Sequence, residues 1–138
     1  MIRELLTGHM PLSEREALLI SPLRLAYIGD AVHDLVIRTD LLFTGGNVRA
    51  MHRNAVRAVN ASAQAQTLGR ILPILTETEN DVVRRGRNAH ANHDAPKRTD
   101  LADYSKATGF EALVGFLYMT GQMERLREVC VVARDRAD

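Results

Sequence analysis

The sequence predicts an all-α protein of about six or seven helices, organised as a single domain over residues 1–138. Apolar residues recur at helical spacing, and valine-, isoleucine- or threonine-rich alternation never extends beyond a few residues. Aromatic residues, which strands favour, make up only 4% of the chain. The length of 138 residues fits one domain, since domains usually contain roughly 100–200 residues.

Capping residues mark the first two helices. Ser13 is followed three positions later by Glu16, which is the pattern of a capping box. In Ser21-Pro22, serine is the expected cap and proline the first helical residue of a longer helix. We expect this second helix to run to about Phe43, because two glycines follow at positions 45 and 46.

The remaining helices follow from the same kind of signal. Asn47 is a suitable cap for a helix that continues to about Asn60, with a second segment up to Leu72 before a proline. Thr76 or Thr78 caps the next helix. Its end is expected near residue 86, followed by a polar loop at 89–99, a helix over 100–119 and a last helix over 122–133.

Composition and the chain start exclude several classes of protein. No uninterrupted apolar stretch is longer than five residues, so we expect no membrane span. Glu4 lies where a signal peptide would carry positive charge, which predicts a cytoplasmic protein. Cys130 is the single cysteine, so an internal disulfide and a cysteine-based zinc site are excluded. Its valine neighbours predict that Cys130 lies in the core.

The net charge of +1 hides an uneven distribution along the chain. Residues 41–99 contain nine bases and four acids, and no acid occurs between Leu41 and Thr76. Charge separated in this way favours a surface that meets a polyanion. A solvated basic face, with its balancing acids elsewhere in the fold, remains the alternative.

Two acids occur among apolar residues of predicted helices. Asp30 shares helical spacing with Leu23, Tyr27 and Ile37, and Glu111 has Gly115 and other small or apolar residues one turn away. A carboxylate on an apolar face needs hydrogen bonds, a cation or a raised pKa. A shared divalent cation such as Mg²⁺ and ordinary structural pairing both remain open at this point.

Three motifs in this order resemble the ribonuclease III family. The Gly29-Asp30-Ala31-Val32 segment resembles the signature helix of the catalytic domain, and Phe110-Glu111-Ala112 resembles its second motif. Between them, Arg85-Gly86-Arg87-Asn88-Ala89 is similar to a basic element of the short bacterial branch, mini-ribonuclease III. That branch has the catalytic domain alone, and the resemblance covers about residues 20–130.

The resemblance implies that Asp30 and Glu111 are catalytic ligands of Mg²⁺, which would activate a water for phosphodiester hydrolysis leaving a 5′-phosphate. Longer family members carry two further acids, at positions where this chain has Ala26 and Thr108. The mini branch is similar at both positions. We therefore expect an active enzyme in which RNA phosphates complete the metal site.

The expected substrate is double-stranded or structured RNA, in particular a ribosomal RNA precursor, bound by a homodimer with ribosomal proteins as further partners. Double-stranded RNA is recognised mostly through phosphates and 2′-hydroxyls. Two groups of residues are the predicted RNA contacts, one around the polar loop and one on a helix edge: Arg84, Arg85, Arg87, Asn88, Lys97 and Arg98, and Arg49, Arg53 and Arg57. The apolar face of Leu25, Ile28, Val32 and Leu35 is either core or dimer surface.

Two other functions compete with this hypothesis. A catalytically silent, ribosome-associated RNA-binding relative would explain Ala26 and Thr108. A helical protein-interaction module would need no RNA contact at all. The presence of both Asp30 and Glu111 favours the enzyme, because a pure RNA binder gains nothing from acids that face a polyanion.

Overall fold

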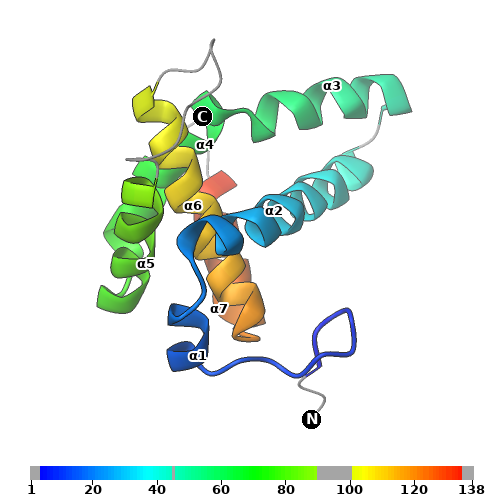
Figure 1. Ribbon diagram of the computed structural model, residues 1–138. Coiled ribbons are helices and arrows are strands. Elements are labelled where there is room, and N and C mark those ends of the chain that lie inside the picture. Colours follow the sequence, from blue (N-terminus) through cyan, green and yellow to red (C-terminus); the bar gives the residue numbers. More distant parts are fainter. Residues whose placement is uncertain (1–3, 45, 90–100, 135–138) are drawn as a thin grey trace.

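The computed structural model describes residues 4–44, 46–89 and 101–134, and within these ranges the protein is helical, as predicted (Figure 1). No strand occurs in the described ranges. The elements in chain order are α1 (Glu14–Leu18), α2 (Pro22–Thr44), α3 (Val48–Val59), α4 (Ala61–Ile71), the 3-10 turn η1 (Leu72–Ile74), α5 (Glu77–Asn88), α6 (Leu101–Met119) and α7 (Met123–Arg134).

The predicted caps are confirmed. Glu16 N donates to Ser13 Oγ at 3.0 Å and Ser13 N donates to the Glu16 carboxylate at 3.0 Å, which completes a capping box at α1. Asn47 caps α3. For α5 the cap is Thr76 rather than Thr78, and the helix continues two residues past the expected end at Gly86. Side-chain oxygens therefore satisfy the free amides where these helices begin.

Helix α6 is the centre of the fold. It contacts α1, α2, α4, α5 and α7, and it lies between α2 and α5 (Figure 1). From Ala107 to Tyr118 every residue except Glu111 is buried. A helix that is apolar on all sides is stable only when other helices surround it. The buried cluster around α6, with Phe110, Leu113, Phe116 and Leu117, forms the main hydrophobic core.

Two glycines bring α2 and α6 into backbone contact. A Cβ atom at Gly29 would overlap the carbonyl oxygen of Glu111, and a Cβ atom at Gly115 would overlap the carbonyl oxygen of Leu25. Only glycine leaves room for such an approach. Gly115 therefore lets α2 approach α6 closely.

A second pair of glycines joins α5 to α6. A Cβ atom at Gly86 would lie 2.9 Å from the Cα atom of Gly109, and a Cβ atom at Gly109 would lie 2.9 Å from the carbonyl oxygen of Val83. Both distances are shorter than real Cβ contacts allow. Helix α6 therefore presents one glycine to each of its two principal neighbours.

The prediction that Asp30 lies on a core-facing surface of α2 is wrong. The buried face runs through Leu25, Gly29, His33 and Ile37 at four-residue spacing, and Asp30 is exposed beside it. The expected neighbour Tyr27 is 83% exposed. The correct face depends on the glycine contact, which hydrophobicity alone does not reveal. In the candidate apolar face, Leu25 belongs to the core whereas Leu35 is 52% exposed.

Helices α5 and α7 are joined by a partly buried ion pair. Arg125 donates to both oxygens of the Glu79 carboxylate at 2.8 Å, and to the carbonyl oxygen of Ile74 at 2.7 Å. These hydrogen bonds lower the pKa of Glu79, which is almost fully buried. The arrangement holds the start of α5 in place, and the buried Cys130 of α7 is core, as expected.

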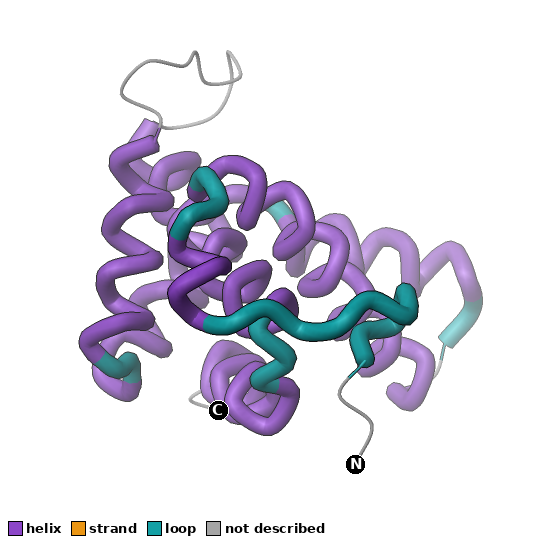
Figure 2. The backbone as a smooth tube through the Cα atoms, turned by 60° about the horizontal axis from the view of Figure 1, so that its bottom comes forward, coloured by secondary structure: helices purple, strands orange, loops and turns teal. Residues whose placement is uncertain are grey.

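The second half of α2 extends away from α5 and packs with α3 (Figures 1 and 2). On α3, Ala55 is buried while Arg49, Arg53 and Arg57 are exposed. The basic helix edge predicted from their four-residue spacing is therefore present. None of the described helices is long and apolar enough to span a membrane.

Replacement of Gly115 by alanine is expected to lower the free energy of unfolding by about 3 kcal/mol, because the added methyl group forces α2 away from α6. Gly69 is the matched control, since a Cβ atom there meets nothing within 4 Å. Gly69→Ala should raise stability by about 0.5–1 kcal/mol, as for an exposed helical glycine. Denaturant unfolding of both variants measures the change in the free energy of unfolding. Equal stability of Gly115→Ala and the parent chain would contradict the close contact.

Candidate active site

The glycine contact places the two predicted acids together. Gly29 precedes Asp30 on α2, and its Cα faces the backbone of Glu111 on α6. The two carboxyl groups are close enough for Asp30 to act on Glu111 both through a hydrogen bond and through its charge. The described part of the chain thus unites, at one helix crossing, two acids that lie far apart in the sequence.

The two carboxyl groups differ in environment. Asp30 is exposed, whereas Glu111 is half-buried within the otherwise buried segment of α6. Burial, and after it the neighbouring Asp30, raise the pKa of Glu111 to about 9. No arginine or lysine of the described residues is among the causes of this shift. Glu111 is therefore protonated at neutral pH unless a cation joins the pair.

The pair fits a magnesium ion. Carboxylate oxygens are preferred ligands of Mg²⁺, which commonly uses one or two carboxylates together with waters and substrate phosphates. The described residues contain no group of three or more Asp, Glu, His or Cys side chains suited to a metal. Asp30 and Glu111 would therefore hold the ion as two protein ligands, one reaching it from solvent and the other from the core.

The positions of the two missing acids are closed by packing. Ala26, one turn before Asp30, is 8% exposed, and Thr108, one turn before Glu111, is 5% exposed. Thr108 Oγ1 donates to the carbonyl oxygen of Tyr104 at 3.0 Å, within α6. Both side chains belong to the packed interior. The hydrophobic core therefore continues without a break next to Asp30 and Glu111.

A buried histidine, His33, packs against the part of α6 that precedes Glu111. His33 lies on the core face of α2, with its ring edge-on to Phe110 at a centroid distance of 4.9 Å. Its Nδ1 atom lies 3.5 Å from Nε2 of Gln64, which is also buried. Burial lowers the pKa of His33 to about 4, so the ring is neutral at pH 7. Since Phe110 precedes Glu111, this contact helps to fix that part of α6.

The predicted RNA contacts lie in two separate places. Arg84, Arg87 and Asn88 are exposed on α5, and Arg84 forms an ion pair with Asp81. Arg85 is half-buried, and its Nη1 donates to the carbonyl oxygen of Leu18 at 3.1 Å, which ties α5 to the end of α1. The α3 group, Arg49, Arg53 and Arg57, is distant from them in the fold (Figure 1). Lys97 and Arg98 fall outside the described residues.

Sequence reasoning missed two features of the site. The first is the function of Gly29, which is part of the matched motif but also makes the close helix contact. The second is His33, which is buried between α4 and α6. The four-residue spacing of Leu25, Gly29, His33 and Ile37 was the available signal, because it is one ridge of a packed helix.

In the absence of divalent cations, the wild-type protein is expected to lose stability relative to Glu111→Gln as the pH rises from about 5 to 9. The folded-state pKa of Glu111 is raised above the ordinary value of 4.5, so its stabilising contribution is complete below 4.5 and is lost toward pH 9. In chemical unfolding with a chelator present, we expect the free energy of unfolding of the wild type to fall by at least about 1 kcal/mol relative to that of Glu111→Gln over this pH range.

The matched control for this experiment is Glu124→Gln, which changes an exposed glutamate on α7. Its pH profile should follow the wild type. Parallel profiles for wild type and Glu111→Gln would show that Glu111 is ionised at neutral pH without a metal, contrary to its environment.

Comparison with known proteins agrees with this geometry. Residues 23–122 match the model of the ribonuclease III domain, a range that includes both acids. The chain is 54% identical over 119 residues to mini-ribonuclease 3 of Symbiobacterium thermophilum, covering 86% of this chain and 91% of that protein. It is 45% identical to mini-ribonuclease 3 of a Thermoanaerobacter species, covering 86% and 83% of the two chains.

A solved structure shows the same fold. The crystal structure of a protein from Fusobacterium nucleatum superposes with a TM-score of 0.75 at 27% sequence identity, covering 83% of this chain and 91% of that one. Motifs, fold, paired acids and extended sequence identity lead to one assignment. The chain belongs to the ribonuclease III family and resembles the mini-ribonuclease 3 branch over most of its length.

Proposed function

We propose that this ribonuclease cleaves double-stranded or structured RNA hydrolytically with Mg²⁺ held by Asp30 and Glu111, in the maturation of ribosomal RNA precursors. The observation that carries the proposal is the half-buried Glu111 beside Asp30. Burial and Asp30 raise the pKa of Glu111, and no arginine or lysine among the described residues counters that shift. A buried carboxyl group without a cation is costly, and a cation that also binds phosphates would offset that cost.

Bound Mg²⁺ would supply Lewis-acid stabilisation and an activated water for attack on a phosphodiester. The chain contributes position and charge. Exposed Asp30 reaches the side from which RNA approaches, while Glu111 is held in the core by its neighbours on α6. No side-chain nucleophile is required, and the only cysteine is buried in α7. Hydrolysis in this manner leaves a 5′-phosphate and a 3′-hydroxyl.

RNA binding is assigned to the two basic surfaces. The exposed Arg49, Arg53 and Arg57 form one edge of α3, and the exposed Arg84, Arg87 and Asn88 lie on α5. Contacts of this kind bind phosphates by charge and shape rather than by base sequence. Arg85 and the residues Lys97 and Arg98 complete the proposed RNA contacts.

Cutting both strands of a duplex requires two active sites, which a homodimer supplies. The supporting observation is an uncovered apolar stripe on α2, where Tyr27, Leu35 and Leu42 are 83%, 52% and 65% exposed. Extended apolar surface of this kind is typical of protein interfaces. We propose that a second copy of the chain covers it, and that the enzyme acts in the cytoplasm with ribosomal proteins as further partners.

Asp30→Asn and Glu111→Gln are each expected to reduce Mg²⁺-dependent cleavage of a labelled RNA duplex at least about a hundredfold, with RNA binding retained. Each substitution keeps the size of the side chain and removes one ligand charge. Asp34→Asn is the matched control, because Asp34 lies one turn from Asp30 and is already paired with Arg38 at 2.8 Å. Its activity should stay within about threefold of wild type.

Absence of cleavage by the wild-type chain on duplex and on structured ribosomal RNA, with binding intact, would favour the silent RNA binder. Unchanged cleavage in either ligand variant would remove that residue from the metal site.

Arg53→Gln is expected to weaken binding of an RNA duplex and to reduce the slope of log affinity against log salt by about one, because one phosphate contact is lost. Arg127→Gln, an exposed arginine on α7, removes the same charge elsewhere on the surface. A salt titration of both variants separates a local contact from net charge. Equal slopes for the two would exclude α3 from the RNA-binding surface.

A further inference from the structure

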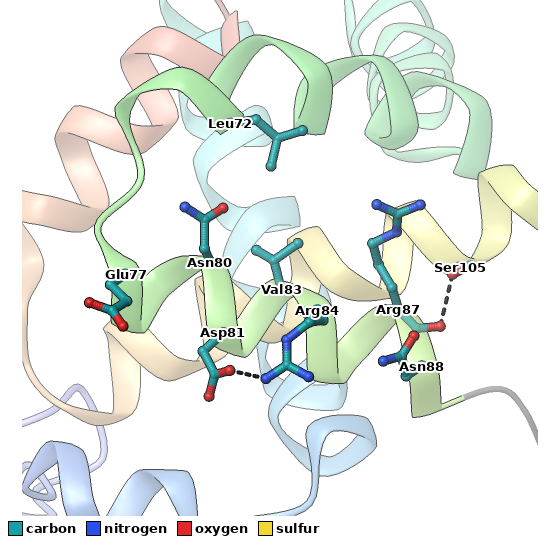
Figure 3. Close-up of a pocket in the computed structure, with 9 residues that line it drawn as sticks. All are labelled: Leu72, Glu77, Asn80, Asp81, Val83, Arg84, Arg87, Asn88 and Ser105. Atoms are coloured by element: carbon teal, nitrogen blue, oxygen red, sulfur yellow. Dashed lines mark hydrogen bonds and ion pairs between the residues drawn. The ribbon is translucent and has the colours of Figure 1, made fainter.

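A cavity of about 540 Å³ lies beside α5, on a part of the surface that includes neither catalytic acid (Figure 3). Its walls come from η1, α5 and the first half of α6: Leu72, Glu77, Asn80, Asp81, Val83, Arg84, Arg87, Asn88 and Ser105. Leu72 points across the cavity toward Asn80 and Val83 (Figure 3). The volume is within the range of roughly 300–1,000 Å³ typical of small-molecule sites.

Four polar side chains of this cavity are without a protein partner in the described part of the chain. The amides of Asn80 and Asn88, the guanidinium of Arg87 and the carboxylate of Glu77 make no hydrogen bond or ion pair with another described side chain. The other arginine, Arg84, is paired with Asp81 across one turn of α5. The cavity therefore combines two apolar side chains, Leu72 and Val83, with a free cation, a free carboxylate and two free amides. Each amide is able to donate and accept hydrogen bonds.

The position of Arg87 is fixed from two directions. Its carbonyl oxygen accepts a hydrogen bond from Ser105 Oγ at 2.8 Å, which joins the end of α5 to α6. Its side-chain stem packs against Gly109 of α6, because a Cβ atom at Gly109 would lie only 2.8 Å from Arg87 Cγ. The guanidinium is consequently directed toward the side of α5 that faces Leu72 (Figure 3).

Charge is ordered along the cavity. Glu77 lies at the first turn of α5, the Asp81–Arg84 pair lies in the middle, and Arg87 lies near the end. An anion is attracted to the Arg87 end and repelled from the Glu77 end. A ligand with a phosphate at one end and an apolar, hydrogen-bonding ring at the other matches this order.

We propose that this cavity binds a single nucleotide, with the phosphate on Arg87, one face of the base against Leu72 and Val83, and the base edge at the amide of Asn80. The nucleotide is either a free nucleoside 5′-monophosphate or an unpaired nucleotide next to an RNA duplex. The second source rests on the proposed cleavage of RNA duplexes, whereas the first does not.

The test measures binding of the full chain to four probes: inorganic phosphate, nucleoside 5′-monophosphates, a blunt RNA duplex, and the same duplex with a single-stranded extension of about five nucleotides. The diagnostic variant is Asn80→Ala, because Asn80 lies outside the residues assigned to duplex binding. Arg87→Gln removes the charge while keeping the stem. Arg127→Gln on α7 is the control of equal charge. Thermal unfolding checks that all variants fold.

A free-nucleotide site predicts binding of monophosphates that weakens about fivefold or more in Asn80→Ala and in Arg87→Gln, and stays within about twofold in Arg127→Gln. An RNA site predicts instead that the extended duplex binds at least about fivefold tighter than the blunt one, and that Asn80→Ala removes this advantage. Either result supports the cavity as a nucleotide site and identifies its source.

Three results overturn the proposal: phosphate alone binding as tightly as the monophosphates with no advantage for the extended duplex, neither the monophosphates nor the extension giving an effect that depends on Asn80, or Arg127→Gln having the same effect as Arg87→Gln. Cleavage of the blunt duplex is measured in parallel with Asp30→Asn as the inactive reference. If the blunt duplex is cut, a negative result concerns the cavity alone. If it is not cut, the proposed function fails, while the monophosphate titration still decides whether the cavity binds nucleotides.

Discussion

The close contact between α2 and α6 is the constraint on which the site depends. Gly29 and Gly115 let the two backbones touch, and the carboxyl groups of Asp30 and Glu111 come together as a result. Any larger side chain at either glycine would separate the helices and, with them, the two acids. The same contact explains the opposite environments of the acids, because Asp30 lies at the edge of the crossing and Glu111 within it.

Most of the fold could be predicted from local signals. Caps such as Ser13, Asn47 and Thr76 act on neighbouring amides, so their effect is visible in a short stretch of sequence. The buried face of α2 could not be found in the same way. Tyr27 has the hydrophobicity of a core residue, yet it is exposed, because the glycine contact and not side-chain size determines which face meets α6.

The candidate site could be predicted in its residues and less so in its environment. Motif resemblance points to Asp30 and Glu111 as the candidate acids, and the structure brings them together, but helical spacing alone placed Asp30 wrongly on a core face. Arg84, Arg85 and Arg87 show the same limit. They lie within four consecutive positions, yet Arg84 pairs with Asp81, Arg85 with the carbonyl of Leu18, and Arg87 faces the cavity. The Asp81–Arg84 pair is local to α5, whereas tertiary contacts that the sequence does not display give Arg85 and Arg87 their different surroundings.

The position of the crossing also has a mechanical consequence. A point where two helices cross acts as a pivot, so bending of one helix relative to the other displaces nearby atoms least and distant atoms most. From Asp30 to the end of α2 the helix extends about 20 Å, and α3 is carried at that far end. Bending at the crossing would therefore displace the far end of α2 most and the carboxyl groups of Asp30 and Glu111 least, and α3, which leads back to α4, restricts that displacement.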